Sequence, residues 1–116
     1  MSPQRGDVFW VQMEPVVGSE IGKTRPAAII SNNVGNRFGS RVLIAPITSS
    51  AAKIYPYEVG FAAGEAGLES DGKILLDQIR CVDKRRLGNR LGALDRQTLR
   101  QVDRALHISL DLRCPQ

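Results

Sequence analysis

The sequence is poor in residues that bind transition metals, cross-link chains or span membranes. Its 116 residues include one histidine, His107, and two cysteines, Cys81 and Cys114, which form no CxxC pair. We therefore expect no transition-metal site and two reduced thiols in a cytoplasmic protein, with a Cys81–Cys114 disulfide as the alternative. No apolar run approaches the roughly 20 residues of a membrane span, and the N-terminus lacks the apolar core of a signal peptide. Neither membrane insertion nor export is expected.

Positive charge is the most informative feature that is present. The chain has 12 arginines and 4 lysines against 12 acidic residues, which gives a net charge of +4. The planar guanidinium fork suits phosphate oxygens and stacks on nucleobases, so the composition favours a polyanion partner without requiring one. Hydrophobic residues make up 42% of the chain, an ordinary share for a soluble protein. We expect a single domain over residues 1–116.

The apolar pattern predicts several short strands followed by one helix. Alternating or short apolar runs predict strands at 6–13, 25–31, 41–49, 72–83 and 87–94. The segment 14–24 is typical of a long loop and 32–40 of a turn. Asp95 can cap a helix whose apolar stripe is formed by Leu99, Val102, Leu106 and Leu110. This order predicts a mainly β fold with a C-terminal α-helix packed on a small, partly open β-barrel.

Four motifs occur in a fixed order with short spacings. They are RGDV, GSEIGKTRPAAIISNN, PITS and LLDQIRCVDKRRLG. Together with the final helix, from Arg5 to Leu112, the sequence resembles the MazF/PemK family of toxin endoribonucleases, the mRNA interferases. The resemblance implies an SH3-like barrel, a homodimer and sequence-specific cleavage of single-stranded RNA. It also implies neutralisation by a cognate antitoxin, whose flexible acidic tail we expect to bind a basic groove.

Arg25 and Thr48 are the predicted catalytic residues. Arg25 lies where the 14–24 loop meets a strand, so a rigid backbone can aim its donors at a phosphate. Thr48 ends the 41–49 strand and offers a hydroxyl to the same group. RNA can be cut by its own 2′-hydroxyl if a protein helps to move the proton and stabilises the phosphorane, without a metal or cofactor. In the family, the positions matching Arg25 and Thr48 are implicated in catalysis.

Five further residues are predicted to bind RNA or to support the site: Ser19, Glu20, Lys23, Asp77 and Gln78. Alternatives remain open, because Arg25 could instead form an ion pair with Glu20 or Asp77. Glu20 could be a general base or could only fix the loop. Some relatives carry a histidine where Ser19 stands and an arginine where Leu75 stands. An acid–base scheme that uses those two side chains is therefore not available here.

Other functions and other RNA contacts stay open at this point. The alternatives are a gyrase-directed toxin of the same fold and a non-catalytic RNA-binding module. The Arg25–Thr48 pair counts against the first, and a pure binding module would tolerate Arg25→Ala with a modest loss of affinity. Phe38 or Tyr57 could stack on a base. The basic stripe on the C-terminal helix is interpreted as a solvated face rather than an RNA contact; it consists of Arg96, Arg100 and Arg104.

Overall fold

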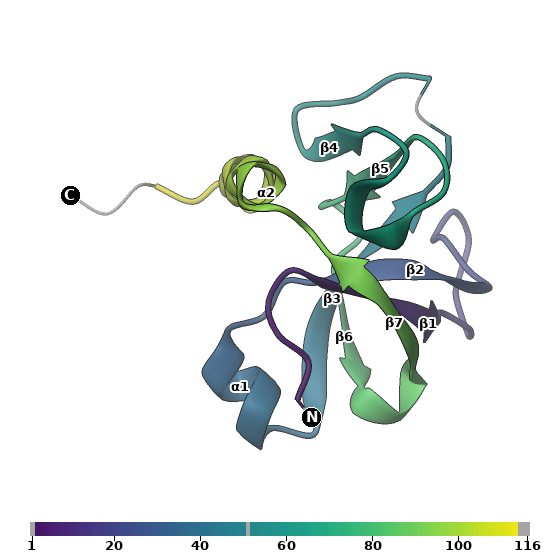
Figure 1. The fold of residues 1–116 in the computed structure, drawn as a ribbon, viewed down its shortest axis with the longest axis vertical. Helices are drawn as coiled ribbons and strands as arrows, with labels where there is room; N and C mark the ends of the chain where they lie inside the picture. The colour runs from purple at the N-terminus through teal and green to yellow at the C-terminus, as the bar shows by residue number, and fades with distance from the viewer. Residues whose placement is uncertain (1, 51, 114–116) are drawn as a thin grey trace.

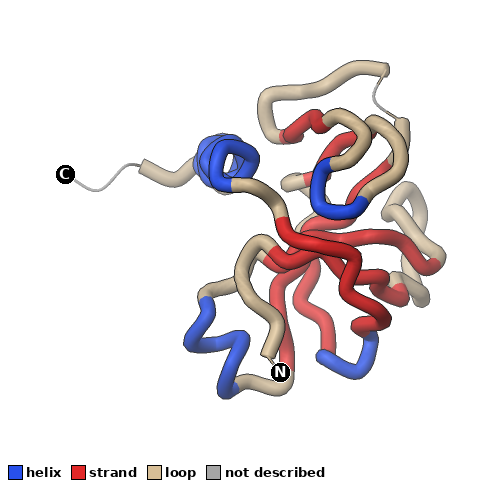
Figure 2. The backbone as a smooth tube through the Cα atoms, viewed as in Figure 1, coloured by secondary structure: helices blue, strands red, loops and turns tan. Residues whose placement is uncertain are grey.

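The computed structural model describes residues 2–50 and 52–113 (Figure 1). The elements within these residues are β1 (Asp7–Gln12), β2 (Thr24–Ile29), α1 (Asn33–Phe38), β3 (Arg41–Thr48), β4 (Glu58–Phe61), η1 (Glu65–Gly67), β5 (Gly72–Leu75), β6 (Arg80–Asp83), η2 (Lys84–Arg86), β7 (Leu87–Ala93) and α2 (Arg96–Ser109). Figure 2 shows the strands passing through the middle of the molecule, with the helices at its periphery. None of the described helices combines the length and the apolar character that crossing a membrane requires.

All seven described strands join one antiparallel sheet. Its order is β4-β5-β3-β2-β1-β7, and β6 pairs with β3 beside this path. Strand β3 is shared, because its first residues pair with β6, its middle with β2 and its end with β5. The outermost strands of the order, β4 and β7, do not pair with each other within the described residues. The predicted mainly β fold, a partly open barrel with a C-terminal helix, is confirmed.

Alternating side chains fill two apolar cores on opposite faces of the sheet. In β2, Ala28 points into one core, whereas Ala27 and Ile29 point into the other. The first contains Val102 of α2 and is called the α2-side core. The second contains Val82 of β6 and is called the β6-side core; its buried members are Val11, Met13, Ala27, Ile29, Val42, Ile44 and Val82. The strand ends that border the β6-side core position the candidate site.

The C-terminal helix begins as predicted and ends before its predicted stripe does. The Asp95 carboxylate accepts a hydrogen bond from the Thr98 amide at 2.8 Å, which caps α2 and lowers the pKa of Asp95. Leu110 lies just beyond the helix and is 54% exposed, so its place in the stripe was predicted wrongly. Buried Ala105 points into the α2-side core instead. The other predicted stripe residues belong to or pack against that core: Leu99, Val102 and Leu106.

Two segments differ from the sequence prediction. The 32–40 turn contains α1, because the Asn32 side chain caps the Gly35 amide at 2.7 Å and the fully buried Asn36 bonds to Ser31. The single strand predicted over 72–83 is two strands, β5 and β6, separated at residues 76–79. The break lets one continuous apolar run pair with two different parts of β3. Strand β4 was not predicted.

The cysteines lie at the surface or outside the described residues. Cys81 is an exposed free thiol on β6. Cys114 lies outside the described residues, as does the disulfide alternative that depends on it.

Candidate active site

The β2–β3 register predicts that Arg25 and Thr48 lie on the same face and at the same end of the sheet. The β2–β3 register pairs Ala27 with Pro46, and continuing it by two residues sets Arg25 opposite Thr48. Side chains two residues apart on a strand share a face, so Arg25 shares the face of Ala27 and Thr48 that of Ile44. Both Ala27 and Ile44 belong to the β6-side core. The two predicted catalytic side chains therefore border the same core where it opens to solvent.

Arg25 is oriented by the loop that precedes it. Its Nε donates a hydrogen bond to the Gly22 carbonyl at 2.8 Å, and its side chain is half-buried. Within the described residues, Arg25 forms no ion pair with Glu20 or Asp77, so the predicted alternative of a structural pair is wrong. Fixing Nε leaves the two terminal nitrogens of the guanidinium as donors for an anion.

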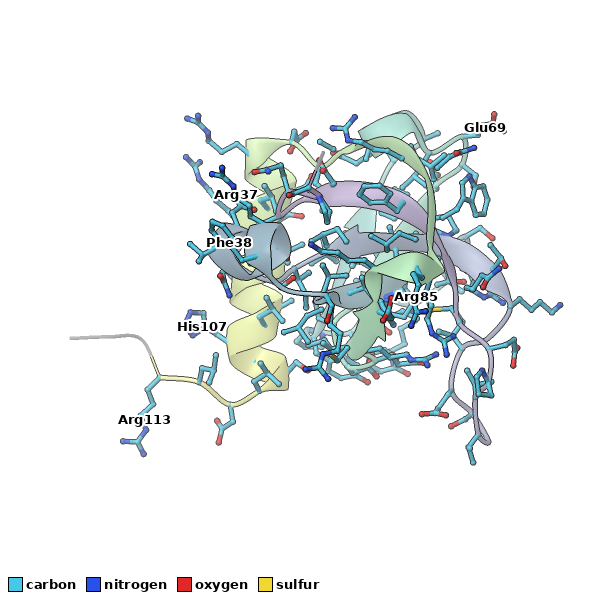
Figure 3. The ribbon with its side chains drawn as sticks, turned by 90° about the horizontal axis from the view of Figure 1, so that it is seen from below. Arg37, Phe38, Glu69, Arg85, His107 and Arg113 are labelled. Atoms are coloured by element: carbon cyan, nitrogen blue, oxygen red, sulfur yellow. The ribbon has the colours of Figure 1, made fainter. Side chains whose placement is uncertain are left out.

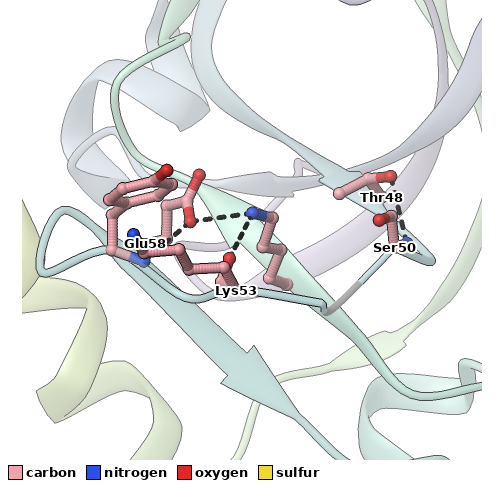
Figure 4. A network of polar contacts seen from close by, with 6 residues as sticks. Thr48, Ser50, Lys53 and Glu58 are labelled. Atoms are coloured by element: carbon pink, nitrogen blue, oxygen red, sulfur yellow. Dashed lines mark hydrogen bonds and ion pairs between the residues drawn. The ribbon is translucent and has the colours of Figure 1, made fainter.

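Thr48 is linked to a polar network on β5. Its Oγ1 accepts a hydrogen bond from the Ser50 amide at 3.3 Å, which leaves the hydroxyl proton free to be donated (Figure 4). Lys73 is its cross-strand partner in β5. The Lys73 ammonium lies 2.9 Å from the Glu58 carboxylate and donates to the Lys53 carbonyl at 2.7 Å. Thr48 is therefore held between a tight turn and a paired lysine.

Four of the predicted supporting residues meet in one open pocket. Ser19, Glu20, Asp77 and Gln78 line a cavity of about 290 Å³ between the β1–β2 loop and the β5–β6 connection. The Gln78 side-chain oxygen accepts a hydrogen bond from the Ile21 amide at 2.8 Å. This bond ties the loop that carries the Arg25 anchor to the β5–β6 connection.

Glu20 and Lys23 have mainly local roles in the loop. Glu20 accepts a hydrogen bond from the Val17 amide, which braces the loop tip. Lys23 is exposed and adopts a left-handed backbone conformation with φ 65°. Its amide donates to the Glu14 carboxylate at 2.9 Å. The Lys23 side chain does not line the pocket formed by the other four supporting residues.

Comparison with known proteins identifies the family of this chain. Residues 4–110 match the family model described as PemK-like, MazF-like toxin of type II toxin-antitoxin system. The chain belongs to this toxin family. It is 44% identical over 113 residues to Endoribonuclease EndoA of Bacillus subtilis (strain 168), an overlap of 97% of each protein. The family resemblance seen in the sequence motifs is confirmed.

Solved structures of MazF toxins share the fold of this chain. MazF (Form-I) from Deinococcus radiodurans is 30% identical with a TM-score of 0.83, covering 96% of this chain and 98% of that one. An endoribonuclease in complex with its cognate antitoxin from Mycobacterial species is 25% identical with a TM-score of 0.81, covering 98% and 100%. These overlaps extend over nearly the whole toxin.

One arginine beside the candidate site of the toxin was not among the predicted site residues. Arg80 of β6 donates a hydrogen bond to the Met13 carbonyl and lines the same pocket as Gln78. Arg80 lies two residues before Val82, a member of the β6-side core, so alternation along the strand sets it on the face of Arg25. Knowing that β6 is a separate strand would have revealed this.

The predicted base-stacking residues lie in different parts of the toxin. Phe38 is 77% exposed on α1 under the Arg37 guanidinium, which is 5.2 Å from the ring centre (Figure 3). Figure 1 shows α1 on the opposite side of the chain from the β1–β2 loop. Tyr57 is closer to the site, and its burial, followed by the Asp77 carboxylate, raises the pKa of its phenol. Within the described residues, no group of three or more His, Cys, Asp or Glu could hold a metal ion.

Proposed function

We propose that this toxin cuts single-stranded RNA at short sequences through the substrate's own 2′-hydroxyl, with Arg25 and Thr48 acting on the scissile phosphate. As a MazF/PemK family member that is 44% identical to EndoA, the chain is an endoribonuclease. The residue assignment is supported by the β2–β3 register, which when continued by two residues sets both side chains on the same face and end of that pair. The relatives do not favour a gyrase-directed toxin or a non-catalytic module.

The chemistry follows from the donors at this strand end. The 2′-oxygen forms a bond to phosphorus and loses its proton, while the bond from phosphorus to the 5′-oxygen breaks and that oxygen gains a proton. Negative charge rises on the non-bridging oxygens in between. Arg25, held through Nε, directs its remaining nitrogens at those oxygens, and Thr48 donates its hydroxyl proton or relays one. The products are a 2′,3′-cyclic phosphate and a 5′-hydroxyl, and no metal ion takes part.

The remaining partners belong to the same proposal. We propose a cytoplasmic homodimer that is neutralised by an antitoxin with a flexible acidic tail. The net charge of +4 supports an acidic partner. Large apolar side chains exposed on α1 and after α2 support self-association; they are Val34, Phe38, Leu110 and Leu112. Light scattering on the purified toxin measures the oligomeric state directly.

The test combines substrate and protein variants. The toxin is incubated in EDTA with a long mixed-sequence RNA, and the new 5′ ends are sequenced to define the cut site. An oligonucleotide with that site should be cut to a 5′-hydroxyl product, and one 2′-deoxyribose at the cut should abolish cleavage. Arg25→Ala should lose at least about 100-fold in rate. Arg25→Lys should also lose most activity, because a point charge cannot reproduce the fork.

Arg100→Ala, an exposed arginine on α2, is the matched control and should cut at the parent rate. Three results would contradict the proposal: a 5′-phosphate product, an absolute requirement for Mg²⁺, or an Arg25→Ala toxin that cuts at the parent rate.

A further inference from the structure

Two tyrosines in the connection from β3 to β4 form a stacked pair. The rings of Tyr55 and Tyr57 lie 5.6 Å apart between centres, with an angle of 6° between their planes. Tyr55 is 40% exposed. Two ammonium groups lie over the Tyr55 ring, that of Lys53 at 4.8 Å and that of Lys73 at 5.8 Å from its centre. An exposed aromatic face beside positive charge is the arrangement that single-stranded nucleic acid requires.

The stacked pair adjoins both parts of the candidate active site. Lys73 is the cross-strand partner of Thr48, and cross-strand partners in an antiparallel pair share a face of the sheet. The lysine that contacts Tyr55 therefore emerges on the Thr48 face. Asp77 links the stack to the other part of the site. After partial burial, the negative charge of Asp77 is the next cause that raises the pKa of the Tyr57 phenol, and Asp77 also lines the pocket under the β1–β2 loop.

The two lysines beside the stack differ in burial and in ion pairing. Lys73 is largely buried and paired with the Glu58 carboxylate at 2.9 Å, so its charge is matched within the protein. Lys53 is exposed, and its ammonium is in no ion pair within the described residues. Its contact with the exposed Tyr55 ring is easily exchanged, because a solvated cation–π contact is weak. Lys53 can leave the ring for a phosphate while a base takes its place.

We propose that the Tyr55–Tyr57 stack is a subsite for one unpaired RNA base close to the cleaved phosphate, with Lys53 bound to the adjoining backbone phosphate. The inference rests on the proposed function. A nucleobase offers the flat face that continues the stack, and its nucleotide carries the negative charge that Lys53 attracts. The subsite makes the stack a determinant of where the RNA is held.

The test is an abasic scan of an RNA that the toxin binds and cannot cut. The oligonucleotide carries the mapped cut site with a 2′-deoxyribose at the cut and a fluorophore at one end. Each flanking base is removed in turn, and Kd is measured by fluorescence anisotropy at constant salt. For the parent toxin, removing the stacked base should raise Kd about tenfold or more. For Tyr55→Ala, the same removal should change Kd by less than about twofold, because the partner ring is gone.

Two further variants separate stacking from folding. Tyr55→Phe keeps the ring and should keep the abasic penalty, whereas Tyr55→Leu keeps bulk without a π face and should lose it. Thermal unfolding of each variant checks that the fold is intact. A toxin that cuts no RNA overturns both the function and the subsite. If the toxin cuts RNA but the abasic penalty is equal in the parent and in Tyr55→Ala, the subsite alone is overturned. The same conclusion holds if the penalty is equal and Tyr55→Ala weakens antitoxin binding.

Discussion

Two connections of equal length, residues 13–23 and 30–40, join β1 to β2 and β2 to β3. The second is held largely by its own side chains, together with Arg5, whose Nε donates to the Ile30 carbonyl at 3.0 Å. Asn36 is fully buried and donates to the Ser31 carbonyl at 2.9 Å, and Asn32 caps α1. The first has local braces from Glu14 and Glu20 and is also held by side chains from far along the chain. Gln78 accepts from the Ile21 amide, and Arg80 donates to the Met13 carbonyl.

The difference separates a structural connection from one coupled to the candidate site. Within the described residues, the 30–40 connection receives no side-chain hydrogen bond from the β5–β6 connection, although the Lys84 amide, just after β6, donates to the Ser40 carbonyl at 3.0 Å. The 13–23 loop includes Gly22, whose carbonyl orients Arg25, so any change in the loop is transmitted to the guanidinium. Exposed segments with few buried apolar contacts open at low free-energy cost. The 13–23 loop is therefore the part of the site that we expect RNA and antitoxin to reposition.

Among the variants of the two connections, the largest loss of cleavage rate should come from removing the hydrogen bond between Gln78 and the Ile21 amide. In Gln78→Ala the Ile21 amide loses its acceptor, the loop shifts, and Arg25 is no longer aimed at the phosphate. We expect the rate of RNA cleavage to fall about 100-fold, because small misplacements of catalytic groups have effects of that order. The melting temperature should change little, since the bond is only partly buried and water can reach the freed Ile21 amide.

The matched control for Gln78→Ala is Gln101→Ala, which makes the same change on an exposed face of α2. It should cut RNA at the parent rate. If Gln78→Ala also cuts at the parent rate, the loop does not depend on the distant side chain.

The second prediction concerns the 30–40 connection between β2 and β3. Asn36→Ala should lower the free energy of unfolding by about 1–3 kcal/mol, because it removes a buried hydrogen-bonded amide and leaves the Ser31 carbonyl and the Asn33 side chain without this donor. Urea unfolding measures this, with exposed Asn89→Ala on β7 as the control. The cleavage rate per folded molecule should be unchanged. A loss of activity in a fully folded Asn36→Ala toxin would show that α1 takes part in the site.

The sequence pattern locates strand ends better than it locates the structure of the connections. Arg25 and Thr48 could be proposed as a pair from sequence because each lies at or next to the end of a strand, and neighbouring strands set such ends together. Helix α1 was missed because asparagine-rich segments favour turns until a buried partner such as Asn36 satisfies the backbone. Arg80 was missed because the apolar run 72–83 gives no sign of where one strand ends and the next begins. That break depends on how β3 is shared, which is a tertiary property.

The smallest change in RNA binding is expected at Lys23, where two variants separate the effect of the backbone conformation from that of the side-chain charge. Its φ of 65° is left-handed, which costs a residue with a Cβ atom about 1 kcal/mol and glycine almost nothing. Lys23→Gly and Lys23→Ala both remove the ammonium, but only the glycine variant relieves the backbone. If Lys23 acts through its charge, both should bind the uncleaved RNA a few-fold more weakly, with the slope of log Kd against log salt reduced by about 0.7 for the lost phosphate contact. Lys23→Gly should unfold at a higher urea concentration than Lys23→Ala. If neither variant binds RNA more weakly, the RNA contact assigned to the Lys23 side chain is wrong, and only the difference in urea stability remains.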